Sequence, residues 1–519
     1  MISFLISIVA LVLGYLIYGR IVERSFGPDD RPTPAITMAD GVDYVVMPTW
    51  KIFMIQFLNI AGTGPIFGAI MGMWFGPAAY LWIVLGCIFA GAVHDYLSGM
   101  LSIRNNGSSL PGLVKLYLGQ TTYVLLLVFS VFLLVIVGAV FVYSPALLLS
   151  DMCGGTTMWT TIWIIVIFVY YLVATLLPID KIIGRIYPVF AIALLFMAAA
   201  LLVMLIIKFP TLPEVWNIGN MDVWRNSQHE GGIDLLGVTQ YIQKNPTFPC
   251  IFITIACGAI SGFHATQSPL MARCVKNERQ CRPIFYGSMI TEGIMALIWA
   301  TVSSYFFYDG GWRELVNPET VQAFLAQADG GKTLIQYFTA PQVVSAVCTG
   351  WLGIVGGILA ILGVVAAPIT SGDTAFRSAR LILGESMGLD QRKKGNRLLI
   401  AIPMFILAAV LLGWQFMNPD GFNTLWQYFG WCNQTLSVIT LWLITVYFVL
   451  KDKFYWMTLI PAVFMTVICS TFVVLSPSML GCDNSLAPVA STIVAAIALI
   501  WFFIWRRRAL NRRQRPDVK

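Results

Sequence analysis

Thirteen long runs of apolar residues decide which folds are open to this chain of 519 residues. Hydrophobic residues make up 58% of the sequence and charged residues only 11%, so one water-soluble core cannot bury them all. About 20 consecutive apolar residues are enough for a helix to cross a bilayer. The runs lie at roughly 2–19, 52–73, 77–101, 121–149, 158–177, 186–207, 248–271, 284–306, 343–371, 398–416, 424–450, 455–476 and 486–505. The sequence therefore predicts an all-α, polytopic membrane protein with about 13 transmembrane helices.

The distribution of lysine and arginine predicts how these helices are oriented. If the N-terminus lies outside, all but five of the 32 basic residues fall on the inner side, in loops or in the tail after Arg506. The five on the outer side are Lys208, Arg225, Lys244, Arg313 and Lys332. Basic residues concentrate in the cytoplasmic loops of membrane proteins. We therefore expect an outer N-terminus and a cytoplasmic C-terminus, and the net charge of +7 requires no nucleic-acid partner.

Both ends of the chain are predicted to stay at the membrane. Residues 1–19 have neither a basic n-region nor a small-residue cleavage pattern, so we expect a first span and not a signal peptide. The arginine-rich tail is expected to rest on anionic lipid headgroups as an anchor.

The ten cysteines show no CxxC motif and no Cys/His spacing typical of a metal site. Several lie inside spans, where cysteine acts as a small hydrophobic residue. Cys153 and Cys482 fall in predicted outer loops, and the sequence leaves open whether they pair. We therefore expect no metal site and no resident cofactor.

Two of the runs are interrupted near their middle, at 62–65 and at 258–262. At the helical rise of about 1.5 Å per residue, both breaks fall near mid-bilayer. Glycine and proline free backbone groups that lipid cannot satisfy, so such a break should line a cavity. Paired broken helices are typical of the substrate site of a transporter. The residues predicted to bind substrate are Gly62, Thr63, Gly64, Pro65, Gly258, Ser261, Gly262 and His264.

The two broken runs begin five spans apart, which predicts an internal repeat. Because five is odd, a copied five-helix unit must re-enter from the opposite face and form an inverted-topology repeat. The orientation derived from charge agrees with this. The predicted parts are 1–51 with a peripheral first helix and an inner loop, 52–207 as the first repeat, 208–247 as an outer loop, 248–450 as the second repeat, 451–505 as two peripheral spans, and 506–519 as a basic cytoplasmic tail.

Two outer segments receive separate predictions. The loop at 208–247 contains Pro210, Pro213, Gly231 and Gly232, which favour irregular structure with one short helix, as a connector or a lid. The segment at 317–338 has a helical apolar pattern with Pro318 suited to a first turn, so we expect a helix lying flat on the outer surface.

The breaks predict helix ends that attract an anion. Pro65 suits the first turn of a new half-helix that Thr63 or Gly64 caps, and Ser261 or Gly262 can cap another from the opposite direction. Free N–H groups and the helix dipole at such ends favour a carboxylate. The glycine spacing does not match a nucleotide-binding fingerprint, and no strand precedes it. The alternative that both breaks are only packing kinks stays open.

The span assignment places no lysine or arginine near mid-bilayer. An anionic substrate there needs helix ends, hydroxyl groups or a co-bound cation, which favours coupled symport over uniport. The ionisable residues within spans are candidates for coupling to a proton or another cation, because such residues are costly in lipid: His94, Asp95, His264, Glu292 and Asp373. By their positions in the spans, all five are expected between mid-bilayer and the inner face.

These candidates differ in their alternatives. His94 and Asp95 are adjacent, so we expect them to point to different sides of a helix, and a structural role is equally open. Glu292 lies too deep in its span to reach water easily, which suits a proton carrier, although a structural hydrogen bond is the alternative. Thr370, Ser371 and Asp373 gather oxygen ligands suited to sodium where span nine is predicted to end, unless they only cap that helix. No HExxH or similar spacing supports a metalloenzyme, so we expect no enzyme.

At these same residues the chain resembles the carbon starvation protein A (CstA) family of bacterial inner-membrane transporters. The matching stretches are AGTGP at 61–65, GP at 76–77, AGAVHD at 90–95, GSSL at 107–110 and FITIACGAISGFHA at 252–265, with Glu292 after them. The likeness covers most of spans two to eleven and is weaker near the C-terminus.

The resemblance implies a LeuT-like five-plus-five inverted repeat of the amino acid–polycation–organocation superfamily, and uptake of pyruvate or small peptides during nutrient limitation. It also implies a sodium site beside the first broken helix, to which Thr370 and Ser371 would lend hydroxyl groups by position. We therefore expect a cation-coupled importer of a small carboxylate or short peptide in a bacterial inner membrane. A passive channel or a sensor using the same cavity is the alternative, and the sequence decides neither the coupling ion nor the oligomeric state.

Overall fold

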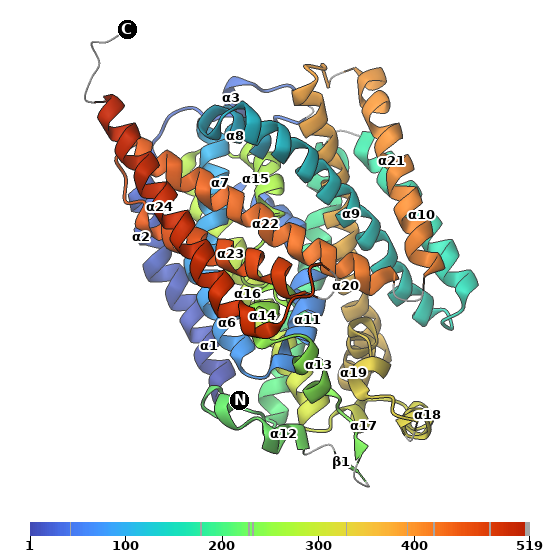
Figure 1. The fold of residues 1–519 in the computed structure, drawn as a ribbon. Helices are drawn as coiled ribbons and strands as arrows, with labels where there is room; N and C mark the ends of the chain where they lie inside the picture. Colours follow the sequence, from blue (N-terminus) through green and yellow to red (C-terminus); the bar gives the residue numbers. More distant parts are fainter. Residues whose placement is uncertain are drawn as a thin grey trace.

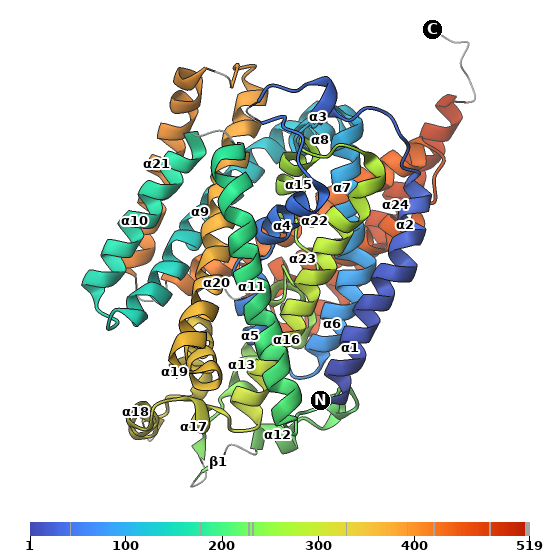
Figure 2. The ribbon, with the colours of Figure 1, turned by 180° about the vertical axis from the view of Figure 1, so that it is seen from behind.

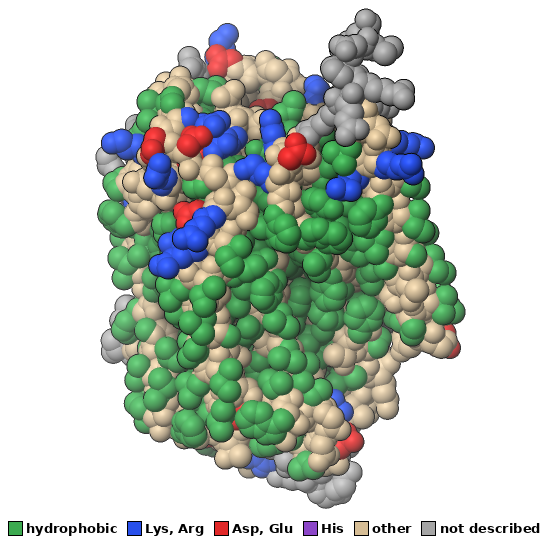
Figure 3. Space-filling model, turned by 90° about the vertical axis from the view of Figure 1, so that its left-hand side faces the viewer, with side chains coloured by type: hydrophobic (Ala, Val, Ile, Leu, Met, Phe, Trp, Pro, Cys, Tyr) green, Lys and Arg blue, Asp and Glu red, His purple; other side chains and the backbone are tan. Residues whose placement is uncertain are grey.

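Long apolar helices run between the two ends of the molecule (Figure 1). The computed structural model describes residues 1–41, 43–176, 179–226, 229–230, 233–328, 330–391, 393–418, 421–476 and 479–513. Figure 3 shows a broad belt of hydrophobic side chains below an end where lysine and arginine gather. We call that end the basic face; α3 (Pro34–Thr37) lies there (Figure 1), and in or beside the segment that precedes α3, Arg31 pairs with Asp29, Arg104 with Glu278 and Arg279 with Asp30.

The N-terminal part contains the first broken helix. Its helices are α1 (Ile2–Leu13), α2 (Gly19–Phe26), α3 (Pro34–Thr37), α4 (Thr49–Ile60), α5 (Ala69–Gly72), α6 (Ala78–Gly86), α7 (Ala92–Arg104), α8 (Leu110–Leu118), α9 (Gln120–Met152), α10 (Thr157–Leu176) and α11 (Ile179–Lys208). Short π-helical turns join several of them, at η1 (Gly14–Tyr18), η2 (Gly64–Gly68) and η4 (Cys87–Gly91), and the 3-10 turn η3 (Met73–Phe75) follows α5.

The C-terminal part contains the second broken helix. Its helices are α14 (Thr247–Thr254), α15 (His264–Ala272), α16 (Ser288–Tyr308), α17 (Trp312–Leu315), α18 (Pro318–Ala328), α19 (Leu334–Tyr337), α20 (Ala340–Ser386), α21 (Lys394–Met417), α22 (Gly421–Leu450), α23 (Trp456–Leu475) and α24 (Ala487–Arg513). Three further turns are η6 (Glu278–Gln280), η7 (Arg282–Gly287) and η8 (Asn484–Leu486).

The predicted spans have counterparts among the described helices. Within the described residues, eleven helices are long and apolar enough to cross a membrane, and the bent pair Thr49–Ile60 and Gly64–Phe75 makes a twelfth span. The remaining predicted span, 248–271, corresponds to α14 and α15, each of which is too short to cross alone. The chain is thus a multi-pass membrane protein, as its apolar composition indicates.

The predicted end of span nine is wrong. The apolar segment at 343–371 was expected to stop at Ser371, but the membrane-length part of α20 runs over Gly356–Ser386. Gly353, with φ +66°, kinks the helix before that part begins. The later residues include Arg377 and Arg380, whose side chains are almost completely buried. Burial against neighbouring helices lets polar residues lie within a span that hydropathy alone would end early.

The loop at 208–247 holds more regular structure than the sequence predicts. It contains η5 (Val215–Asn220), α12 (Asp222–Asn226), a hairpin of β1 (His229–Glu230) and β2 (Ile233–Asp234), and α13 (Val238–Lys244). The ring of Tyr241 on α13 packs edge-on against Trp74, with ring centroids 5.1 Å apart. The loop therefore packs against the Trp74 end of the first broken helix. Gly231 and Gly232, like the tail beyond Arg513, lie outside the described residues.

The helix predicted within 317–338 is present. α18 begins at Pro318, and Figures 1 and 2 show it nearly end-on, away from the bundle axis. The N-terminus, α12 and α17 lie at that same end, opposite the basic face. The segments predicted to be outer thus share one face of the molecule.

Candidate functional site

The first broken helix is built as the sequence predicts. α4 ends at Ile60, the next three residues are not helical, and a π-helical turn begins at Gly64 with Pro65 in its first turn. The two halves bend by 56°. Proline fits there because the first turn needs no N–H donor from it. Thr63 is the residue before the turn, yet its hydroxyl forms no capping hydrogen bond.

The second break is longer than predicted. Helix α15 begins at His264, so neither Ser261 nor Gly262 caps it, and the residue before its first turn is Phe263. Asn433 of α22 occupies this break: its Oδ1 accepts from Phe263 N at 2.7 Å and from Ser261 Oγ at 3.0 Å. Its backbone oxygen accepts from Gly262 N at 3.2 Å. N–H groups that the sequence leaves free for an anion are thus taken by a neighbouring helix.

The two breaks touch each other, and glycine allows the contact. A Cβ atom at Gly64 would lie 2.3 Å from Cys257 Sγ, and one at Gly68 would lie 2.7 Å from Thr254 O. No side chain fits at such distances without movement of a neighbour. Gly64 and Gly68 therefore allow the two broken helices to pack closely. The alternative that the breaks are packing kinks is supported to this extent.

Helix α4 carries unpaired polar side chains toward the first break. Gln56, Asn59 and Thr63 are completely buried, and none of their side-chain N or O atoms has a hydrogen-bond partner among the described residues. Gln56 and Asn59 are three residues apart and lie along one face of α4, and Thr63 follows in the break itself. Sequence reasoning passed over Gln56 and Asn59, although amide side chains inside an apolar span were a usable signal. Buried polar groups need partners, so this face is suited to a polar ligand or to water.

Four of the predicted residues form one chain of ionisable groups. His94 Nδ1 lies 2.8 Å from Asp95 Oδ1, and His264 Nδ1 lies 2.8 Å from Asp95 Oδ2. His264 Nε2 in turn lies 3.5 Å from Glu292 Oε2. The expectation that His94 and Asp95 point apart is wrong. Although the two residues are adjacent on α7, the side-chain torsions of His94 and Asp95 turn the imidazole and the carboxylate toward each other, so that the buried carboxylate accepts from the ring N–H.

The chain joins α7, α15 and α16, and its four side chains are completely buried. Neither oxygen of Glu292 has a hydrogen-bond partner among the described residues, and His94 Nε2 and His264 Nε2 have none either. An ionic pair in a low-dielectric interior is strong only when its remaining polar atoms are satisfied. The arrangement is therefore incomplete without water, a proton or another cation.

Thr370, Ser371 and Asp373 lie inside α20 and not at its end, so the helix-capping alternative is wrong. Ser371 Oγ lies 3.2 Å from Leu58 O and 2.9 Å from Asn59 O, at the last turn of α4 before the break. Thr370 Oγ1 instead bonds within its own helix, 2.9 Å from Ala367 O, and lies 3.5 Å from Leu58 O. These hydroxyl and carbonyl oxygens gather beside the first broken helix.

Asp373 belongs to a different set of contacts from the other ionisable candidates. Its Oδ2 accepts from Tyr187 OH at 2.6 Å. Arg377, one turn further along α20, is completely buried and donates to Ala174 O at 2.7 Å. The sequence analysis did not count this arginine among the charges within spans, because it predicts that span nine ends before Arg377. A guanidinium group is thus available within two turns of Ser371.

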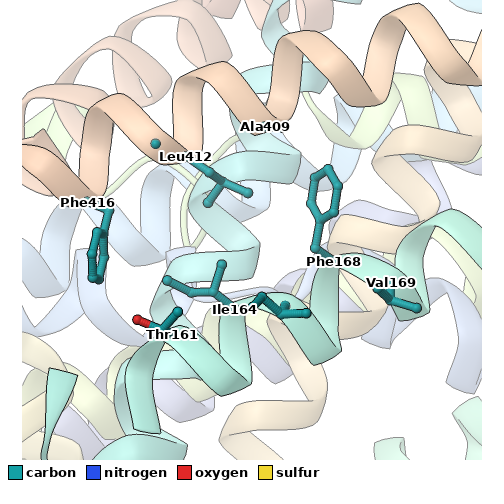
Figure 4. Close-up of a pocket in the computed structure, with 9 residues that line it drawn as sticks. Thr161, Ile164, Phe168, Val169, Ala409, Leu412 and Phe416 are labelled. Atoms are coloured by element: carbon teal, nitrogen blue, oxygen red, sulfur yellow. The ribbon is translucent and has the colours of Figure 1, made fainter. Parts of the chain in front are cut away.

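Two cavities lie away from these residues. One of about 260 Å³ lies between α10 and α21, where Figure 4 shows Phe168, Leu412 and Phe416 around it. Its lining is apolar apart from Thr161, which suits lipid chains. The other, of about 240 Å³, lies near Tyr44, Arg273 and Glu385. Neither contains a residue that the sequence assigns to the site.

A group of three side chains with metal-ligand chemistry also lies at the second break. One donor atom each of Cys257, His264 and Glu292 lies within 4.8 Å of the other two, and all three residues are buried. Among the described residues no other set of three His, Cys, Asp or Glu side chains meets this condition. Sequence analysis did not identify this group, because residues 257 and 264 do not have the spacing of a known metal motif.

The chain matches the protein-family model described as carbon starvation protein CstA, over residues 1–209 and 154–472. An uncharacterized membrane protein of Haemophilus influenzae is 44% identical over 59% of the chain and 91% of its own length. A peptide transporter CstA of Campylobacter jejuni is 28% identical over 88% of the chain and 77% of its length. The pyruvate/proton symporter BtsT of Escherichia coli is 28% identical over 91% of the chain and 81% of its length.

Solved structures share the fold. MhsT in complex with L-phenylalanine superposes with a TM-score of 0.54 at 14% identity, covering 87% of the chain and 99% of MhsT. A manganese transporter of Eremococcus coleocola gives a TM-score of 0.51 at 12% identity, covering 91% of the chain and 99% of that protein. The predicted LeuT-like architecture, with its two broken helices, is thereby confirmed.

Proposed function

Because the chain belongs to the carbon starvation protein CstA family, we propose that it imports a small carboxylate, such as pyruvate, or short peptides by cation symport. Relatives named as peptide transporters and as a pyruvate/proton symporter support both substrate classes. The broken helices would hold the substrate, and rocking of one helix bundle against the other would expose it to each side in turn.

The contact between the two breaks carries this proposal. Both lie within a LeuT-like scaffold, and Gly64 lies directly against Cys257 of the second break. Beside that contact, Gln56, Asn59 and Thr63 present unpaired polar atoms in a buried environment. A protein that only needed stable packing would gain by replacing such groups with apolar ones. A polar ligand that enters and leaves is a reason to keep them.

The balance of buried charge supports a co-transported cation. Asp95, Glu292 and Asp373 are completely buried carboxyl groups, and the buried guanidinium groups described near Asp373 are those of Arg377 and Arg380. Adding an anionic substrate to this interior raises the electrostatic cost unless a cation enters as well. The oxygens around Ser371 suit sodium, and the name of the Escherichia coli relative favours a proton. Sodium and the proton are both kept as proposed coupling ions.

We place the protein in a bacterial inner membrane with its basic face on the cytoplasmic side, because basic loops remain on that side. The N-terminus is then outside, and the arginine-rich end of α24 lies near anionic headgroups. The family description also supports a role in carbon starvation, when scavenging of small metabolites is useful.

Uptake into proteoliposomes tests the function. Purified full-length protein is reconstituted, and accumulation of radiolabelled pyruvate is followed under an inward proton gradient, an inward sodium gradient or neither, with and without a dipeptide competitor. We expect accumulation that collapses with one gradient, which also identifies the ion. Equilibration without accumulation would instead indicate a passive channel. If neither pyruvate nor a labelled dipeptide enters, the transporter proposal is wrong.

A matched pair of variants tests the site. Gln56→Leu removes an unpaired buried amide beside the first break, and Gln415→Leu removes one on α21, far along the chain from either break. We expect Gln56→Leu to lower uptake at least about tenfold, as loss of one or two ligand hydrogen bonds does, and Gln415→Leu to keep it. Equal uptake by both variants would remove Gln56 from the site.

A further inference from the structure

We propose that Cys257, His264 and Glu292 bind a divalent transition-metal ion of the zinc type at the second break. The donor atoms lie within 4.8 Å of one another, and the three residues come from the unwound segment, from α15 and from α16. This metal site is an addition to the proposed transport activity and does not depend on it.

The donor set matches the chemistry of zinc. A thiolate, an imidazole and a carboxylate are the side chains that hold this ion in proteins, at about 2.0–2.3 Å from each donor atom. His264 Nε2 and both oxygens of Glu292 have no hydrogen-bond partner among the described residues, although they are completely buried. An ion between them would give His264 Nε2 and one oxygen of Glu292 a partner. Three protein ligands leave a fourth position for water or for an oxygen of a bound carboxylate.

The groups behind the ligands hold them in the forms that bind a metal. Asp95 Oδ2 accepts from His264 Nδ1 at 2.8 Å, which leaves the lone pair on Nε2 directed to the cluster. Asn433 Nδ2 donates to Cys257 Sγ at 3.5 Å, a contact that favours the thiolate. A carboxylate behind a ligating histidine is a regular feature of zinc sites.

The charges also balance. A divalent ion with one thiolate, one carboxylate and a neutral imidazole forms a group with no net charge, which a low-dielectric interior tolerates far better than an isolated charge. A cysteine that acts only as a small apolar residue needs no such neighbours. Cys87, also completely buried, donates to Met289 O and lies in no cluster of three donors that the structure describes.

Metal binding to the purified full-length protein tests this site. The protein is treated with a chelator, desalted and loaded with Zn²⁺ or Co²⁺, and bound metal is measured by elemental analysis. We expect about one equivalent per chain and, with Co²⁺, the near-ultraviolet charge-transfer band that reports a cobalt–thiolate bond. Cys257→Ser should abolish the band, and Cys250→Ser, a buried cysteine on α14, should keep it.

A second variant keeps the test decisive if Cys257→Ser does not fold. Glu292→Gln retains the thiol and removes a charged ligand, so we expect at least tenfold weaker binding of Co²⁺ by a protein that elutes as a single peak in size-exclusion chromatography. Less than stoichiometric metal in the wild type, or unchanged binding in both variants, would overturn the proposal. Uptake of substrate is not part of this measurement. A failure to bind metal would therefore overturn the metal site and leave the proposed transport function unaffected.

Discussion

At the scale of single residues, Asp95 is the junction of the site, because each of its oxygens accepts from a different histidine. The sequence identified the residue as an ionisable group in a span and placed His94 on another side of the helix. What it did not supply was the partner His264, which is 169 positions away in the chain. A single carboxylate thus fixes the orientation of two buried imidazole rings.

Replacing this carboxylate should impair transport more than folding. Asp95→Asn presents one acceptor and one donor, so it cannot accept from both imidazoles at once. Loss of a charge-assisted hydrogen bond corresponds to about 1.5–3 kcal/mol, so we expect uptake in proteoliposomes to fall at least about tenfold. Asp151→Asn, at the end of α9, is the control and should keep normal uptake. Normal uptake by Asp95→Asn would contradict this role.

Asn433 is the residue of the site that the sequence analysis missed. It satisfies the backbone N–H groups of Gly262 and Phe263, yet it is neither charged nor part of a break. An amide in the middle of the apolar run at 424–450 was a signal that a search limited to ionisable residues passes over.

Removal of this amide should loosen the second break. Asn433→Ala leaves Phe263 N–H and the Ser261 hydroxyl without their acceptor in a buried place, which costs about 1–3 kcal/mol of stability. We expect a lower thermal unfolding temperature in detergent. Asn220→Ala, at an exposed asparagine of η5, is the control and should unfold as the wild type does. A wild-type unfolding temperature for Asn433→Ala would show that water replaces the amide fully.

At the scale of elements, the broken helices combine a predicted sequence signal with an unpredicted contact. Glycine and proline in the sequence indicated where α4 ends, because they interrupt helical hydrogen bonding. The length of the second break did not follow from its glycines, since Asn433 holds residues 261–263 open from another helix. The end of α20 was missed for a related reason: buried arginines count as polar in a hydropathy window although they face neighbouring helices.

The contact between the breaks predicts a sensitive glycine. Gly64→Ala would place Cβ at 2.3 Å from Cys257 Sγ, whereas Gly413→Ala on α21 meets no heavy atom within 4 Å. We expect Gly64→Ala to destabilise the protein by about 1–3 kcal/mol through overpacking and to lose uptake. Gly413→Ala should be neutral or stabilising by up to about 1 kcal/mol. Thermal unfolding of both variants tests this prediction. Equal stability of the two variants would mean that the two breaks move apart at little energetic cost.

At the scale of the whole molecule, charge and hydropathy are arranged in layers. The hydrophobic belt separates the basic face from the face that holds the N-terminus and α18 (Figures 1 and 3). The predicted outer segments come together on one side, which is what an alternating series of spans requires. Their position relative to the cell follows from the positive-inside rule and can be measured directly.

Labelling of cysteines tests this orientation. Cys153 is exposed at the end of α9, in a predicted outer loop, so a membrane-impermeant maleimide should label it in intact cells. Arg279→Cys, at an exposed position of the basic face, is examined in a chain that lacks Cys153 and Cys482. This variant should react only after the cells are permeabilised. The reverse pattern would place the basic face outside.

The sequence by itself determined the number and approximate place of the spans, the position of the two breaks and the separation of charge between the faces. These properties are local: apolar length, helix-breaking residues and loop charge are all read within short windows of the chain. Only the tertiary structure decided which polar groups meet. His94 and Asp95 join His264 and Glu292, Cys257 faces the same point, and Asn433 closes the second break, because helix packing angles bring together residues that are far apart in sequence.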